Sequence, residues 1–210
     1  HSFPTRRSSD LDEYEEFPLT DVQMAYLLGR NDEFDLGGIS THGYYEVLTK
    51  LDIKKLEKSL NRTIKEQSMF RTVFSKSGMQ RVLKYVPEYS ITVEDLSLCS
   101  KKEQQEKILM ERSRMSHYVF DVEKWPLFEF KAFKINSQEY YLFIGIDLLI
   151  ADGSSMRILV RELKREYDYE ATSSMQQKFD YKDYVHALEE FKNSDIYMED
   201  KGYWTDRIDL

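Results

Sequence analysis

The sequence has little of what marks several classes of protein. Its 210 residues include one cysteine, Cys99, so no disulfide can form within the chain and a zinc site built from cysteines is disfavoured. No apolar run approaches the roughly 20 residues that a membrane-spanning helix needs. Acidic residues outnumber basic ones, 38 to 30, which argues against the basic face that nucleic-acid binding requires. We therefore expect a soluble, cytoplasmic protein that binds neither nucleic acid nor membrane.

Proline and glycine are also scarce, with four and eight residues, so no flexible linker marks a domain boundary. Residues 1–10 (HSFPTRRSSD) contain two arginines and one acid and lack the apolar segment of a secretory signal. Together with Leu11 they look like one reading frame of a common sequencing-library adapter. We expect residues 1–10 to be such an artefact, disordered and dispensable, and residues 11–210 to form one unit.

Apolar residues recur at helical or strand spacing along this unit. Thr20, with Gln23 three positions later, has the form of a capping box and predicts the start of a short helix. The predicted strands cover 44–49, 70–75, 81–86, 127–135 and 139–149, with a hairpin turn at 76–78; helices cover 53–64, 101–116 and 156–167, and a loop covers 32–43.

The stretch 139–149 is apolar on both of its faces. A strand of this kind usually lies in the interior of a sheet and is covered by helices. Hairpins and helices alternate along the chain, so the predicted fold class is α/β, an α+β sandwich with a mixed sheet covered by helices.

The segment from Asp147 to Ser155 (DLLIADGSS) lies where this strand gives way to the next helix. The ends of interior strands are common positions for binding sites. Asp152 has a structural explanation as the cap of the following helix. Asp147 is different, because an acid inside an apolar strand needs a partner. From the residues alone, both a functional site and a simple helix cap remain open.

Asp147, Asp152 and Ser155 reproduce a DxxxxDxxS pattern, which resembles the signature of heterocyclization domains of non-ribosomal peptide synthetases. The resemblance covers nearly everything after residue 16. The further stretches that carry it are FPLTDVQMAYLLGR at 17–30, LGGISTHGY at 36–44, MFRTVF at 69–74, HYVFD at 117–121, WPLF at 125–128, YKDY at 181–184 and YW at 203–204.

The wider condensation superfamily, related to chloramphenicol acetyltransferase, carries HHxxxDG at this position. Aligned on Asp152 and Gly153, its two histidines fall on Asp147 and Leu148. The second histidine usually has the catalytic role, and a leucine cannot serve as a general base. This difference favours the heterocyclization branch, or an inactive relative, over an ordinary condensation domain.

The resemblance implies a chloramphenicol-acetyltransferase-like lobe with a site at this motif. By that resemblance Asp147, Asp152 and Ser155 are the catalytic candidates, supported by Gly153 and by Arg71. We expect Asp147 and Asp152 at the mouth of one cleft, with Asp152 paired to Arg71 because buried acids need a cation. Thr41 and His42 lie in the LGGISTHGY stretch, which resembles family sequence, and we expect them to line the cleft.

The implied activity joins an acyl or peptidyl thioester on an upstream carrier domain to cysteine, serine or threonine on a downstream carrier, and then closes a thiazoline or oxazoline ring. The partners are these peptidyl carrier domains, whose phosphopantetheine arms bring the substrates, so no cofactor is bound directly. Family members have two lobes around the active site, and this chain matches the N-terminal one. We therefore expect a fragment that is inactive without its C-terminal lobe.

Two other interpretations stay open. Where the family has Arg-His, this chain has Glu66 and Gln67, which gives some support to a non-catalytic docking or scaffold lobe. The other interpretation is a related acyltransferase that acts on small thioesters. No metal is expected, because the histidines at positions 42, 117 and 186 lack the spacing of metal ligands.

Overall fold

A computed structural model describes residues 14–30, 38–169 and 180–208. The predicted adapter segment, 1–10, and residues 32–37 of the predicted loop lie outside this part. Within it, no helix combines the length and apolarity needed to cross a bilayer.

The larger of two sheets has four strands in the order β2-β7-β6-β5. Its strands are β2 (His42–Thr49), β5 (Thr92–Asp95), β6 (Phe128–Lys134) and β7 (Tyr140–Asp147). Neighbours run antiparallel except for the parallel β5–β6 pair, so the sheet is mixed. The predicted interior position of β7 is confirmed, since β7 lies between β2 and β6.

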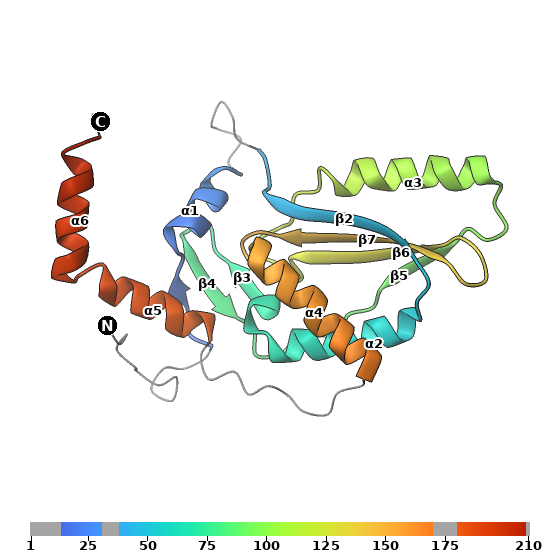
Figure 1. Cartoon of the computed structure of the whole chain (residues 1–210), viewed down its shortest axis with the longest axis horizontal. Helices are drawn as coiled ribbons and strands as arrows, with labels where there is room; N and C mark the ends of the chain where they lie inside the picture. The colour runs from blue at the N-terminus through green and yellow to red at the C-terminus, as the bar shows by residue number, and fades with distance from the viewer. Residues whose placement is uncertain (1–13, 31–37, 170–179, 209–210) are drawn as a thin grey trace.

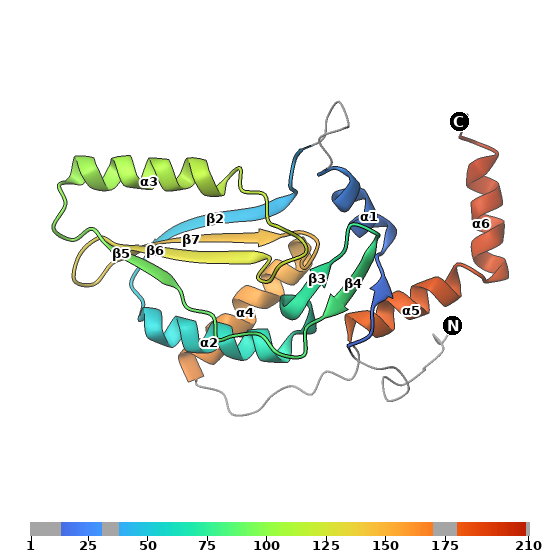
Figure 2. The ribbon, with the colours of Figure 1, turned by 180° about the vertical axis from the view of Figure 1, so that it is seen from behind.

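Helices cover both faces of this sheet, as Figures 1 and 2 show. On one face lie α2 (Ile53–Glu66) and α4 (Gly153–Tyr169), and on the other lies α3 (Lys101–Met115). Along β7, Leu142 and Ile146 join the core beneath α2 and α4, whereas Phe143 packs with residues of α3. This alternation explains why both faces of β7 are apolar and confirms the predicted α/β class.

The smaller sheet has the order β1-β4-β3, with β1 (Phe17–Pro18), β3 (Thr72–Phe74) and β4 (Met79–Val82). The predicted hairpin is present, but both strands differ from 70–75 and 81–86. Residues Ser68–Arg71 form a 3₁₀ turn, η2, and beyond Val82 the backbone of Leu83 bonds to Arg71 instead. The predicted capping box also forms, at the start of α1 (Asp21–Leu28), which lies beside this sheet.

Two further helices, α5 (Tyr181–Phe191) and α6 (Asp195–Thr205), extend from the side of the smaller sheet (Figure 1). Val185 of α5 is fully buried against Phe17 and Val82, which attaches α5 to the body. None of the residues of α6 is buried. The C-terminal part of the described chain is therefore held mainly through α5.

Candidate functional site

Asp147 is the last residue of β7, and its carboxylate is fully buried. Arg30 Nη2 donates to both carboxylate oxygens at 2.6 Å. The hydroxyl of Ser40 donates at 3.3 Å and the backbone N–H of Leu149 at 2.9 Å. A buried carboxylate is tolerated when it is paired and hydrogen-bonded in this way. Asp147 therefore has the partner that its apolar surroundings require.

Asp152 precedes the first residue of α4, and its carboxylate caps the helix by accepting from the N–H of Ser155. Its Oδ1 accepts hydrogen bonds from the backbone N–H of Ser155 at 2.7 Å and from the Ser155 hydroxyl at 2.6 Å. These hydrogen bonds lower the pKa of Asp152, so the carboxylate is charged at neutral pH. Asp152 and Ser155 thus form one hydrogen-bonded unit at the start of α4.

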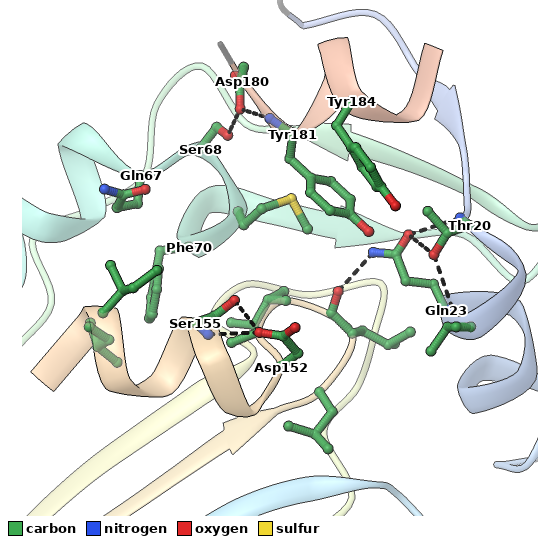
Figure 3. A pocket seen from close by; sticks show the side chains of 18 of the residues that line it. Thr20, Gln23, Gln67, Ser68, Phe70, Asp152, Ser155, Asp180, Tyr181 and Tyr184 are labelled. Carbon is green, nitrogen blue, oxygen red and sulfur yellow. Dashed lines mark hydrogen bonds between the residues drawn. The ribbon is translucent and has the colours of Figure 1, made fainter. Parts of the chain in front are cut away.

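A cavity of about 720 Å³ opens beside this unit, between α1, η2, the loop 148–152, α4 and α5 (Figure 3). Its wall includes Leu148, Asp152 and Ser155 from the motif. The wall also includes Tyr181 and Tyr184 of α5, and Thr20 and Gln23 at the start of α1; all four are labelled in Figure 3. Burial raises the pKa of the Tyr181 phenol, so its hydroxyl stays protonated at neutral pH.

The structure separates the predicted site residues into two groups. Asp152 and Ser155 contribute to the cavity wall, whereas Asp147, Gly153, Arg71, Thr41 and His42 are absent from the described lining. The two ring nitrogens of His42 lie at hydrogen-bond distance from the carbonyl oxygens of Ser40 and Met115, and the Thr41 carbonyl accepts from the N–H of Leu148. Thr41 and His42 therefore adjoin the motif through the backbone at the start of β2, and they are not part of the described cavity lining.

The predicted pair of Asp152 with Arg71 is wrong. Arg71 Nε donates to the carbonyl of Ile64 at 3.2 Å, and Nη1 donates to that of Leu83 at 2.8 Å. The last carbonyls of a helix lack partners within it, and Arg71 supplies one at the end of α2. Of the two motif aspartates, Asp147 is the one that pairs with an arginine, Arg30.

Sequence reasoning missed the residues that connect α1 to the motif. Gln23 is buried, and its Nε2 donates to the Leu149 carbonyl at 2.8 Å and to Gln80 Oε1 at 3.1 Å. Gln80, also buried, donates to the carbonyl of Pro18. One signal for Arg30 was present in the sequence, because a carboxylate in an apolar strand calls for a cation, and Arg30 ends the FPLTDVQMAYLLGR stretch.

The cavity wall is largely apolar, and its described charged residues are all acidic. Its described lining contains Asp21, Asp152, Glu162 and Asp180 but no lysine, arginine or histidine. Some of these acids have partners, since Asp21 pairs with Lys192 and Asp180 accepts from the Ser68 hydroxyl. Across the described residues, no three histidine, cysteine or acidic side chains gather as metal ligands would. The wall offers hydroxyls, amides and carboxylates to a substrate, and Leu148 offers no proton acceptor.

The fold and the motif at the end of β7 define a class of protein. Residues 13–210 match the condensation domain family, and the chain belongs to this family. Bacitracin synthase 1 of Bacillus licheniformis is 34% identical over 98% of the chain, and pyochelin synthetase PchF of Pseudomonas aeruginosa is 28% identical over 93%. The chain spans 4% and 11% of these two proteins.

Among solved structures, a cyclization-docking bidomain of the non-ribosomal peptide synthetase EpoB from Sorangium cellulosum is similar, with a TM-score of 0.88. Its sequence is 29% identical, over 93% of this chain and 39% of that one. The predicted condensation-domain fold and family are confirmed by these comparisons.

Proposed function

We propose that this chain is part of a heterocyclization domain of a non-ribosomal peptide synthetase. The domain condenses a carrier-bound acyl or peptidyl thioester with carrier-bound cysteine, serine or threonine and cyclodehydrates the product to a thiazoline or oxazoline. The observation that carries the proposal is the DxxxxDxxS motif at the end of β7, with Leu148 on the cavity wall where ordinary condensation domains have the second histidine. The relation to the EpoB cyclization bidomain supports it.

The proposed reaction has two stages. The amine of the downstream residue attacks the upstream thioester, so an amide bond forms and the thiol of the upstream arm leaves. The side-chain thiol or hydroxyl then adds to the amide carbonyl, and loss of one water gives the ring. Both stages need close positioning of the reacting groups, a proton shuttle and stabilisation of a tetrahedral oxyanion.

In this proposal the described residues orient the substrate, and they are not the groups that transfer protons to or from it. Ser155 and Asp152 present a fixed hydroxyl–carboxylate unit at the wall, and the protonated Tyr181 hydroxyl is a hydrogen-bond donor on the same wall. Leu148 contributes an apolar surface. In this proposal the proton shuttle comes from the C-terminal lobe that the resemblance implies.

The partners in this proposal are upstream and downstream peptidyl carrier domains and the C-terminal lobe of the same domain. The substrates arrive on phosphopantetheine arms, so the domain itself holds neither a metal nor a nucleotide. The chain spans 39% of the EpoB bidomain, and the complete activity is therefore assigned to a longer protein.

One observation favours a second function, a non-catalytic docking lobe. Gln67 is part of the cavity wall, and Glu66 is the last residue of α2 beside it. The family pattern has Arg-His at these two positions, so the cavity wall lacks the basic group at position 67, and an acid replaces the arginine next to it. Loss of basic groups from a site that must stabilise negative charge would weaken catalysis.

The test uses the full-length synthetase that contains this chain, with an acyl-loaded upstream carrier and a downstream carrier loaded with cysteine or, as control, alanine. Mass spectrometry of the downstream carrier should show an amide that loses one water with cysteine, and an amide that is stable with alanine. An amide without water loss from the cysteine carrier contradicts heterocyclization. No amide from either carrier supports the docking lobe instead.

A further inference from the structure

Two contacts join α1 to the loop that leaves β7. Near the start of α1, the Gln23 amide donates to the carbonyl of Leu149 at 2.8 Å, which is one of the dashed lines in Figure 3. Just after the end of α1, Arg30 donates to both oxygens of Asp147. The residue between these two attachment points is Leu148, which lies on the cavity wall.

Each contact is itself held in place. The Gln23 Oε1 atom accepts from the N–H of Thr20 at 3.0 Å, as part of the capping box, and from Gln80 Nε2 at 2.9 Å. Arg30 and Asp147 are both nearly inaccessible, with side-chain exposures of 8% and 0%. Buried side chains that hydrogen-bond one another in this way restrict each other's arrangement, although Arg30 Nε itself has no partner among the described residues.

Asp147 is poorly placed for direct chemistry. Its two oxygens receive four hydrogen bonds, from Arg30 twice, Ser40 and Leu149, and it is absent from the described cavity lining. A general acid or base must come within hydrogen-bond reach of the substrate, directly or through one water. Asp147 instead fixes the first turn of the loop, because its carboxylate and its carbonyl bond the N–H groups of Leu149 and Ile150.

We infer that α1 braces the motif loop: Gln23 and Arg30 are positioning residues that set the loop 148–152, and Asp147 anchors that loop to Arg30 without exchanging protons with substrate. This inference rests on the proposed function. It gives Asp147 the role of fixing the loop in position. Asp152 and Ser155 remain the polar side chains of the motif that line the cavity.

The first test is a double-mutant cycle in the full-length synthetase, with Arg30→Gln, Asp147→Asn and the combined variant. Each single change leaves one charge buried without its partner, and misplacement of the loop should lower turnover roughly 100-fold. The combined variant restores a neutral pair of amides and should regain at least about tenfold over either single variant. If the combined variant regains stability to urea but stays as inactive as Asp147→Asn, Asp147 takes part in the chemistry and the inference is wrong.

A matched control is the bidentate pair of Glu46 and Arg112, which joins β2 to α3 on the same sheet. Neither residue belongs to the described lining of the cavity. The same cycle with Glu46→Gln and Arg112→Gln should change stability and leave turnover per folded molecule unchanged.

The second test covers the case in which the Asp147 variants fail to fold. Gln23→Met keeps the side-chain length but removes the donor to Leu149, and turnover per folded molecule should fall about tenfold or more. The control is Gln104→Met, because Gln104 also donates to two backbone carbonyls, those of Leu96 and Ile135, far from the loop. Unchanged turnover per folded molecule in Gln23→Met would overturn the inference that α1 positions the loop 148–152.

Both tests count every product that the wild-type protein forms, amide or ring. A wild type that forms the amide but no ring contradicts the proposed heterocyclization and still allows the brace to be tested. The failure of one proposal is thus distinguishable from the failure of the other.

Discussion

Asp147 and Asp152 belong to one short motif but have different surroundings. Asp147 is buried and paired with Arg30, whereas Asp152 is exposed and caps α4 through Ser155. The sequence predicted that Asp147 needs a partner and that Asp152 suits a helix cap, but it assigned an arginine, Arg71, to Asp152. It did not identify Arg30, because pairing across 117 positions is decided by how α1 packs on the sheet.

At the residue scale, Asp152→Ala should lower the free energy of unfolding by about 1 kcal/mol at neutral pH, since a helix cap is lost. The folded-state pKa of Asp152 is lowered, so its stabilising contribution is present above the ordinary carboxyl pKa and is lost as the pH falls through the folded value. Urea unfolding at neutral pH and near pH 3 measures this. Asp152→Asn, which retains a capping oxygen, should lose less; equal losses at both pH values would refute the capping role.

A second residue-scale prediction concerns Glu46. Hydrogen bonds from Arg112, with help from the Tyr141 and Tyr44 hydroxyls, lower the pKa of Glu46 to about 2. The stability that this pair contributes is therefore complete above about pH 4.3 and is lost as the pH falls toward 2. In urea unfolding across this window, Glu46→Gln should give a flatter dependence of stability on pH than the wild type. An unchanged slope would contradict the pairing.

At the scale of elements, the spacing of apolar residues and the residue types at turns predicted most of the helices and strands. The stripe from Ile53 to Ile64 and the apolar stretch at 139–149 became α2 and β7, because burial on one stripe or on both faces dictates these patterns. The ends of the hairpin strands were missed. Arg71 forms hydrogen bonds with the backbones at Ile64 and Leu83, and sequence periodicity holds no signal for such tertiary contacts.

The hairpin turn also positions α1. Gly78 has φ +85°, a conformation that residues with a side chain rarely adopt, and a Cβ there would lie 2.5 Å from Met24 Cε of α1. Gly78→Ala should therefore cost about 1–2 kcal/mol of folding free energy, measured by denaturant unfolding. Gly202→Ala in α6 is the control, because nothing lies within 4 Å of its added Cβ, and stability should stay equal or rise. A neutral Gly78→Ala would show that the turn tolerates a side chain.

At the scale of the whole molecule, one helix carries several exposed apolar residues and packs little against the rest of the described chain. The helix α6 extends away from both sheets (Figures 1 and 2) and buries none of its residues. The large apolar side chains exposed on it or just after it are Ile196, Met198, Tyr203, Trp204 and Ile208. A helix that exposes several large apolar side chains and buries none of its residues is a candidate interaction face.

We therefore expect the 210-residue chain on its own to self-associate. Trp204 is 60% exposed, and Trp204→Lys should shift sedimentation-velocity profiles toward the monomer. The control is Leu98→Lys, because Leu98 is also exposed but lies in the loop before α3. A wild-type chain that stays monomeric at all accessible concentrations would contradict this expectation.

The central claim is that these residues supply one wall of a site and hold its motif loop, while the chemistry needs the remainder of the domain. On the proposed function, a chain without the opposite wall cannot hold the two carrier arms together, and the advantage of co-positioning, about 7–11 kcal/mol at best, is lost. The most direct test incubates residues 11–210 and the full-length synthetase separately with loaded carriers and follows the downstream adduct by mass spectrometry. The account predicts the dehydrated ring product from the full-length protein alone; that product from residues 11–210 would contradict it.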